Sequence, residues 1–105
     1  MGGRAKVWVD GGFSRGSDIV KAKILGAELV GVGRLYCYAL AAAGEAGVSR
    51  MLEILSAEIH EVLGLLGVTS FAQLDASYLH AVEPVVQPHV HSAFPLTNLG
   101  DPGYR

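Results

Sequence analysis

Two short apolar runs, each ending in glycine and separated by one helix-length segment, constrain the fold more than any other feature of the sequence. The first run, residues 7–9, leads into Asp10, Gly11 and Gly12. The second run lies within a predicted strand over residues 28–33, which begins with Glu28, ends at Gly33 and is followed by Arg34. Apolar runs that alternate with a helix favour parallel strands, and parallel strands are buried on both faces. The pattern therefore predicts an α/β fold with two adjacent parallel strands.

The residues at both strand ends suit a bound anion. Glycine lets a backbone N–H group approach an anion closely, and the N-terminus of a following helix adds a favourable dipole. Two such ends side by side would make one phosphate-binding cup, although Asp10 could instead satisfy local amides in a capped turn. The candidate ligand-binding residues are Asp10, Gly11, Gly12, Ser14, Arg15, Gly33 and Arg34.

Apolar residues at helical spacing predict one helix between the two strands and two more after the second strand. A first helix would be capped by Ser14 or Ser17 and would end at Gly26. Residues 35–43 predict a short second helix, and residues 45–66 predict a long one that stops at Gly67. Ser70 is expected to cap a last short helix over residues 71–74.

The composition changes beyond residue 80, where prolines and glycines suppress regular structure. We therefore divide the chain into a folded part, 1–80, and an extended C-terminal tail, 81–105. His89 and His91 lie in this tail, but a pair of histidines without a third ligand does not predict a metal site.

Charge and cysteine content exclude several classes of protein. The net charge is −2 and no basic stripe is present, so we expect no nucleic-acid partner. The most apolar stretch, residues 35–48, is interrupted by Gly44, Glu45 and Gly47, so we expect no membrane span.

Cys37 is the single cysteine, which rules out an internal disulfide and fits a reducing compartment. Since no apolar leader opens the chain, we expect a cytoplasmic location.

Three motifs together resemble one family. They are Asp-Gly-Gly-Phe-Ser-Arg-Gly-Ser-Asp at 10–18, Val-Gly-Val-Gly-Arg at 30–34 and Leu-Ala-Ala-Ala-Gly-Glu-Ala-Gly-Val at 40–48. This set resembles the C-terminal part of the FMN-dependent α-hydroxy acid dehydrogenases and oxidases, which include glycolate oxidase, L-lactate dehydrogenase and mandelate dehydrogenase. The resemblance implies a partial TIM (β/α)8 barrel: its last two βα units, strands 7 and 8, plus C-terminal helices.

The resemblance also implies roles for the candidate residues. Gly12 and its neighbours would place N–H groups on the FMN phosphate, and Asp10 would bind the ribityl hydroxyls. Gly33 and Arg34 match the family residues that bind the same phosphate. Ser14 stands where the family has the arginine that reaches the phosphate, and Arg15 matches the position beside it. Because serine carries no charge, the resemblance implies a phosphate site that has lost one cation.

The family's catalytic groups have no matching positions in this chain. Its histidine base and its substrate-binding arginine both precede the seventh strand, so we expect a portion of an L-2-hydroxy acid dehydrogenase or oxidase that is inactive alone. A two-stranded sheet leaves its edges unpaired, which predicts a homo-oligomer or pairing with a separate N-terminal barrel portion. The alternatives are a non-catalytic oligomeric module that binds FMN or phosphate, and a structural oligomer with an empty site.

Overall fold

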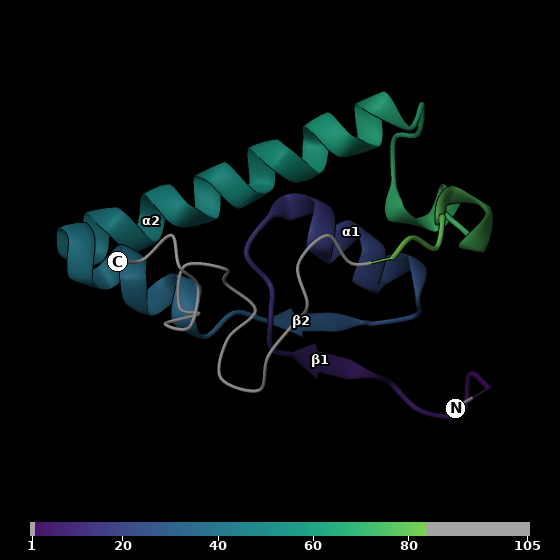
Figure 1. The fold of residues 1–105 in the computed structure, drawn as a ribbon, viewed down its shortest axis with the longest axis horizontal. Helices are drawn as coiled ribbons and strands as arrows, with labels where there is room; N and C mark the ends of the chain where they lie inside the picture. The colour runs from purple at the N-terminus through teal and green to yellow at the C-terminus, as the bar shows by residue number, and fades with distance from the viewer. Residues whose placement is uncertain (1, 84–105) are drawn as a thin grey trace.

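The computed structural model describes residues 2–83, which form one strand–helix–strand unit followed by a long bent helix (Figure 1). In chain order the elements are β1 (Trp8–Asp10), α1 (Gly16–Ile24), β2 (Leu29–Gly31), α2 (Arg34–Leu65) and two 3-10 turns, η1 (Phe71–Gln73) and η2 (Ala76–Tyr78). The predicted tail lies outside the described residues from position 84 onward, as do His89 and His91. Among residues 2–83, none of the helices combines the length and the hydropathy of a membrane span.

The two strands are parallel neighbours, as the sequence predicts, although β1 starts one residue later than predicted and β2 is shorter than the predicted strand at 28–33. Trp8 pairs with Leu29, Val9 with Val30 and Asp10 with Gly31. The pairing extends one residue further back, where the N–H of Glu28 donates to the carbonyl of Val7 at 2.8 Å. This register brings the ends of both strands to the same edge of the sheet.

Helix α1 begins with a carboxylate cap rather than the predicted serine cap. Arg15 is the N-cap residue, and the Asp18 carboxylate accepts the backbone N–H groups of Arg15 at 2.9 Å and of Ser14 at 3.1 Å. A charged acceptor in the first turn makes a stronger bond than a hydroxyl and also complements the helix dipole. The helix ends as predicted at Gly26, whose φ of 101° closes the last turn.

Helix α2 contains the predicted break between a short and a long segment. Ala43 and Gly44 leave helical geometry, and Gly44 has a φ of 58°. A methyl group on Gly47 would collide with the carbonyl oxygen of Ala39, so the two segments touch through their backbones. The long segment ends with Gly67 at a φ of 73°, where the sequence predicts its stop.

Helix α1 lies between the sheet and the long segment of α2 (Figure 1) and contacts both β2 and α2. A side chain on Gly16 would place its Cβ 2.6 Å from Cβ of Glu58, so only glycine permits this approach of α1 to α2. The buried apolar residues gather around this contact. They are Val20, Ala22, Ala27, Met51, Leu55, Leu63 and Val68.

The prediction that β1 is buried on both faces is wrong for the described chain. All three residues of β1 are exposed, and Trp8 retains 70% of its accessible surface. Leu29 on β2 and Leu25 after α1 are also exposed, at 50% and 77%. Two of the three residues of β1 are apolar, but the sheet of the described residues has only two strands, so no further strand covers β1.

Candidate functional site

The strand ends carry the first part of the site. Asp10 ends β1 directly opposite Gly31, which ends β2. A Cβ on Gly31 would lie 3.1 Å from Oδ1 of Asp10, so the carboxylate rests against the bare backbone of its partner strand. The pairing fixes the Asp10 carboxylate at the edge from which both following loops depart.

A cavity of about 230 Å³ lies between those two loops. This is several times the ~30 Å³ that one water molecule occupies in the liquid, so a phosphate group can enter it. The cavity brings together five of the seven predicted site residues, from segments more than twenty positions apart. Its lining residues are Asp10, Gly11, Gly12, Phe13, Gly33, Arg34 and Leu35.

Backbone geometry leaves this cavity open to a ligand. Gly11 and Gly12 have φ values of 104° and 79°, in the region that favours glycine. A Cβ at Gly11 or at Gly33 would meet nothing within 4 Å, so the glycines leave space and accessible backbone. Gly33 is also the N-cap of α2, whose first N–H groups have no partner within the helix and carry partial positive charge.

The cavity is suited to a ligand that has both an anion and hydroxyl groups. Arg34 is the basic residue among those lining it, and it lies at the start of α2. Asp10 is the acidic one, and an ionised carboxylate accepts hydrogen bonds from hydroxyls. These residues therefore fit the phosphate of FMN on the α2 side and the ribityl hydroxyls on the Asp10 side.

The other two predicted site residues, Ser14 and Arg15, do not line this cavity. The Ser14 hydroxyl lies 3.4 Å from Oδ2 of Asp18. The Arg15 guanidinium is held by Glu58 of α2, with 2.7 Å from Nε to Oε1. Ser14 and Arg15 follow Gly12 directly in the same loop, but the fold turns them toward the helices.

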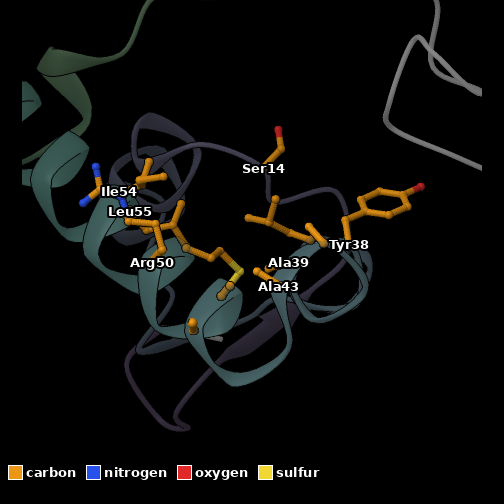
Figure 2. A pocket seen from close by; sticks show the side chains of 12 residues that line it. Ser14, Tyr38, Ala39, Ala43, Arg50, Ile54 and Leu55 are labelled. Atoms are coloured by element: carbon orange, nitrogen blue, oxygen red, sulfur yellow. The ribbon is translucent and has the colours of Figure 1, made fainter.

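A second cavity, of about 530 Å³, was not predicted from the sequence. It lies between the two segments of α2 and is lined mainly by aliphatic side chains, including Ala39, Met51 and Leu55. Figure 2 shows Ser14 and Tyr38 on one side of it and Arg50 and Ile54 on the other. The bend at Gly44 creates this space, and a bend angle cannot be read from helical periodicity.

Next to the site, the side chain of Cys37 raises the pKa of the Tyr36 phenol. The larger cause is a hydrogen bond between the two side chains, and the smaller one is the charge of the ionised Cys37. Tyr36 follows the cavity residues by one position, and its side chain is exposed. Within residues 2–83, no group of three or more side chains has the arrangement of a metal site.

The fold and the first cavity define an α/β chain in which two parallel strands end around a space suited to an anion. The sequence matches the model of one family, the FMN-dependent dehydrogenases, over residues 1–81. The chain belongs to this family, whose cofactor is FMN.

Similar proteins are hydroxy acid oxidases and dehydrogenases. An L-lactate oxidase from Nostoc sp. is 40% identical over 80 residues, covering 76% of this chain and 22% of the relative. The (S)-mandelate dehydrogenase of Pseudomonas putida is 49% identical over 73 residues, covering 70% and 19%. The chain therefore spans about a fifth of the length of these relatives.

The described fold is also similar to a solved structure. The recombinant flavin-binding domain of baker's yeast flavocytochrome b2 superposes with a TM-score of 0.65 at 36% sequence identity. The superposition covers 86% of this chain and 27% of that domain. The described fold is thus similar to part of a flavin-binding domain.

Proposed function

We propose that this chain supplies the phosphate end of the FMN site in an FMN-dependent dehydrogenase or oxidase of L-2-hydroxy acids. The observation that carries the proposal is the single cavity shared by the loops after β1 and β2, with Arg34 in its wall. Family membership supports FMN as the ligand, because FMN is the cofactor of the family.

Each cavity residue then has a defined task. Arg34 and the first N–H groups of α2 neutralise and hold the phosphate dianion, since charge-assisted hydrogen bonds are the strongest available to it. Gly11 and Gly12 admit the phosphate to the backbone of the first loop, and Gly33 does so on the second. Asp10 accepts hydrogen bonds from the ribityl hydroxyls. When bound, FMN would supply the hydride acceptor for oxidation of the hydroxy acid.

The chain would occupy the place of the last two βα units, strands 7 and 8, in a TIM barrel, with residues 1–80 as the barrel portion. The parallel register, the long helix after β2 and the likeness to part of a flavin-binding domain support this placement. The histidine base and the substrate-binding arginine would then belong to polypeptide that precedes the seventh strand. The described chain alone would be inactive.

The exposed apolar surface supports a requirement for a partner. Trp8 and Leu29 would be buried by further strands in a complete barrel, and exposed apolar strands with open edges favour association. A separate N-terminal barrel portion, or further copies of this chain, would supply that cover. A non-catalytic module that binds FMN or phosphate is the second candidate, because the cavity assembles within this chain alone.

Titration with FMN and with riboflavin tests the proposed function. Riboflavin lacks only the phosphate, so we expect FMN to bind and riboflavin to bind at least about tenfold more weakly, the effect of losing charge-assisted hydrogen bonds. Arg34→Gln should remove most of this difference. Equal binding of both flavins, or binding of neither, would contradict the proposal and favour a structural oligomer with an empty site.

Addition of an L-2-hydroxy acid separates the two candidate functions. The FMN-loaded chain alone should leave the flavin spectrum oxidised under either candidate. Bleaching of the flavin when the missing barrel portion is supplied would support the dehydrogenase, and an oxidised spectrum in that complex would leave the non-catalytic module.

A further inference from the structure

A loop of three residues after β1 forms part of the wall of the smaller cavity. Gly11, Gly12 and Phe13 make up this loop, and all three line the cavity. The two glycines have φ values of 104° and 79°. Because glycine adopts many backbone conformations at similar energy, the loop residues do not fix the shape of the loop by themselves. Its shape therefore depends on what holds its two ends.

Hydrogen bonds hold both ends of this loop. At the first end, Asp10 is paired with Gly31 of β2. At the second end, Oδ2 of Asp18 accepts the backbone N–H groups of Ser14 at 3.1 Å and of Arg15 at 2.9 Å. The Ser14 hydroxyl lies 3.4 Å from the same oxygen. One carboxylate oxygen on α1 thus fixes the point at which the loop joins the helix.

The carboxylate of Asp18 is carried by a helix end that is itself held in place. The backbone N–H of Asp18 donates to the carbonyl of Arg15 at 3.1 Å, and the residue is half-buried. The next N–H along, that of Gly16, donates to Oε2 of Glu58 on α2 at 2.6 Å. The second end of the loop is therefore tied to α1, and α1 is tied to the helix that begins at the second loop.

We propose that Asp18 is a positioning residue for the phosphate site. Acting through Ser14 and Arg15, it holds the loop of Gly11 and Gly12 in the conformation that opens its backbone to the cavity before a ligand arrives. Asp18 does not itself line that cavity. A loop that is already ordered loses less conformational entropy on binding, so the ligand binds more tightly. This inference rests on the function proposed above.

The negative charge of Asp18 gives the proposal a prediction of opposite sign to a simple charge effect. A carboxylate near an anion site repels the anion, so charge alone predicts tighter phosphate binding when Asp18 is neutralised. Loss of the loop contact predicts weaker binding. In the full chain, Asp18→Ala should weaken binding of inorganic phosphate and of FMN by about tenfold, the cost of ordering roughly one residue of backbone. Unchanged or tighter binding would overturn the proposal.

Two further variants separate positioning from stability. Asp18 is the third residue of α1, where a glutamate side chain also reaches back to the N-cap N–H, so Asp18→Glu should restore most of the affinity. Val20→Ala is the matched control, because Val20 lies on the same helix and is 2% exposed. It should lower the melting temperature and leave both affinities unchanged. An equal loss of affinity in Val20→Ala and Asp18→Ala would assign the effect to stability and overturn the proposal.

Amide order parameters measured without ligand separate this inference from the proposed function. Those of Gly11 and Gly12 should fall in Asp18→Ala and keep their wild-type values in Val20→Ala. If wild type binds neither phosphate nor FMN, the proposed function fails, and the order parameters still test the loop contact. Unchanged order parameters in Asp18→Ala would overturn the proposal. If Asp18→Ala does not fold, Asp18→Asn takes its place, since a neutral amide accepts a weaker hydrogen bond than a carboxylate.

Discussion

The Asp10 carboxylate lies beside Gly31, its partner across the two parallel strands, with 3.1 Å between Oδ1 and the position that a Cβ of residue 31 would take. The position of the Asp10 carboxylate in the cavity therefore depends on the absence of a side chain at residue 31 on the other strand.

Gly31→Ala should therefore weaken FMN binding by moving Asp10. The added methyl forces the carboxylate aside by a few tenths of an ångström, and because Asp10 is exposed it can move at little cost. We expect the free energy of unfolding to change by less than about 0.5 kcal/mol, because the group that must move is exposed. Affinity for FMN should fall, and affinity for inorganic phosphate should not. Equal loss for both ligands would show that Asp10 does not bind the ribityl hydroxyls.

Gly16→Ala should destabilise the fold far more. Its Cβ would lie 2.6 Å from Cβ of Glu58 and 2.8 Å from the backbone nitrogen of Ile59, and the backbone cannot yield easily. We expect a loss of about 1–3 kcal/mol in urea unfolding, the usual cost of overpacking. Gly64→Ala is the control, because a Cβ there meets nothing within 4 Å, and it should be neutral or stabilising. Similar effects of both substitutions would contradict the close approach of α1 to α2.

Trp8, the single tryptophan, reports whether the exposed strand becomes covered. It is 70% exposed in the isolated chain, so its emission should be that of a solvated indole at low concentration. If the chain associates through β1, the emission will shift to the blue as concentration rises, in step with the mass measured by light scattering. A monodisperse monomer with unchanged emission at every concentration would contradict association through this strand.

Lowering the pH should destabilise the turn at η2. Hydrogen bonds from the side chain and the backbone N–H of Ser77 lower the pKa of Asp75, and the N–H donates to Oδ1 at 2.8 Å. Because the folded pKa lies below the unfolded one, the contact stabilises the turn above the unfolded pKa. This contribution is lost as pH falls through the folded pKa. The amide shift of Ser77 should follow that titration and become independent of pH in Asp75→Asn. A shift that still titrates in the variant would assign it to another group.

Local signals in the sequence predicted most of the fold. Glycines at 26 and 67 mark where helices end, Gly44 marks the bend in α2, and the two apolar runs pair in parallel. The meeting of Gly12 with Gly33 could also be predicted, since parallel strands place their carboxyl ends at one edge.

Long-range contacts could not be predicted in the same way. The partner of Arg15 is 43 positions away on another helix, and no local pattern indicates that Glu58 will reach it. The exposure of Trp8 was missed because an apolar run indicates that a strand is normally covered, but not which polypeptide covers it.

Backbone amide chemical shifts on addition of FMN test the central claim most directly. The account predicts that shifts move together at Gly11 and Gly12 in the first loop and at Gly33 and Arg34 in the second, and that riboflavin leaves the second loop unchanged. Shifts confined to one loop, or centred on Arg15 and Gly16 at the start of α1, would contradict a phosphate site shared by the two strand ends.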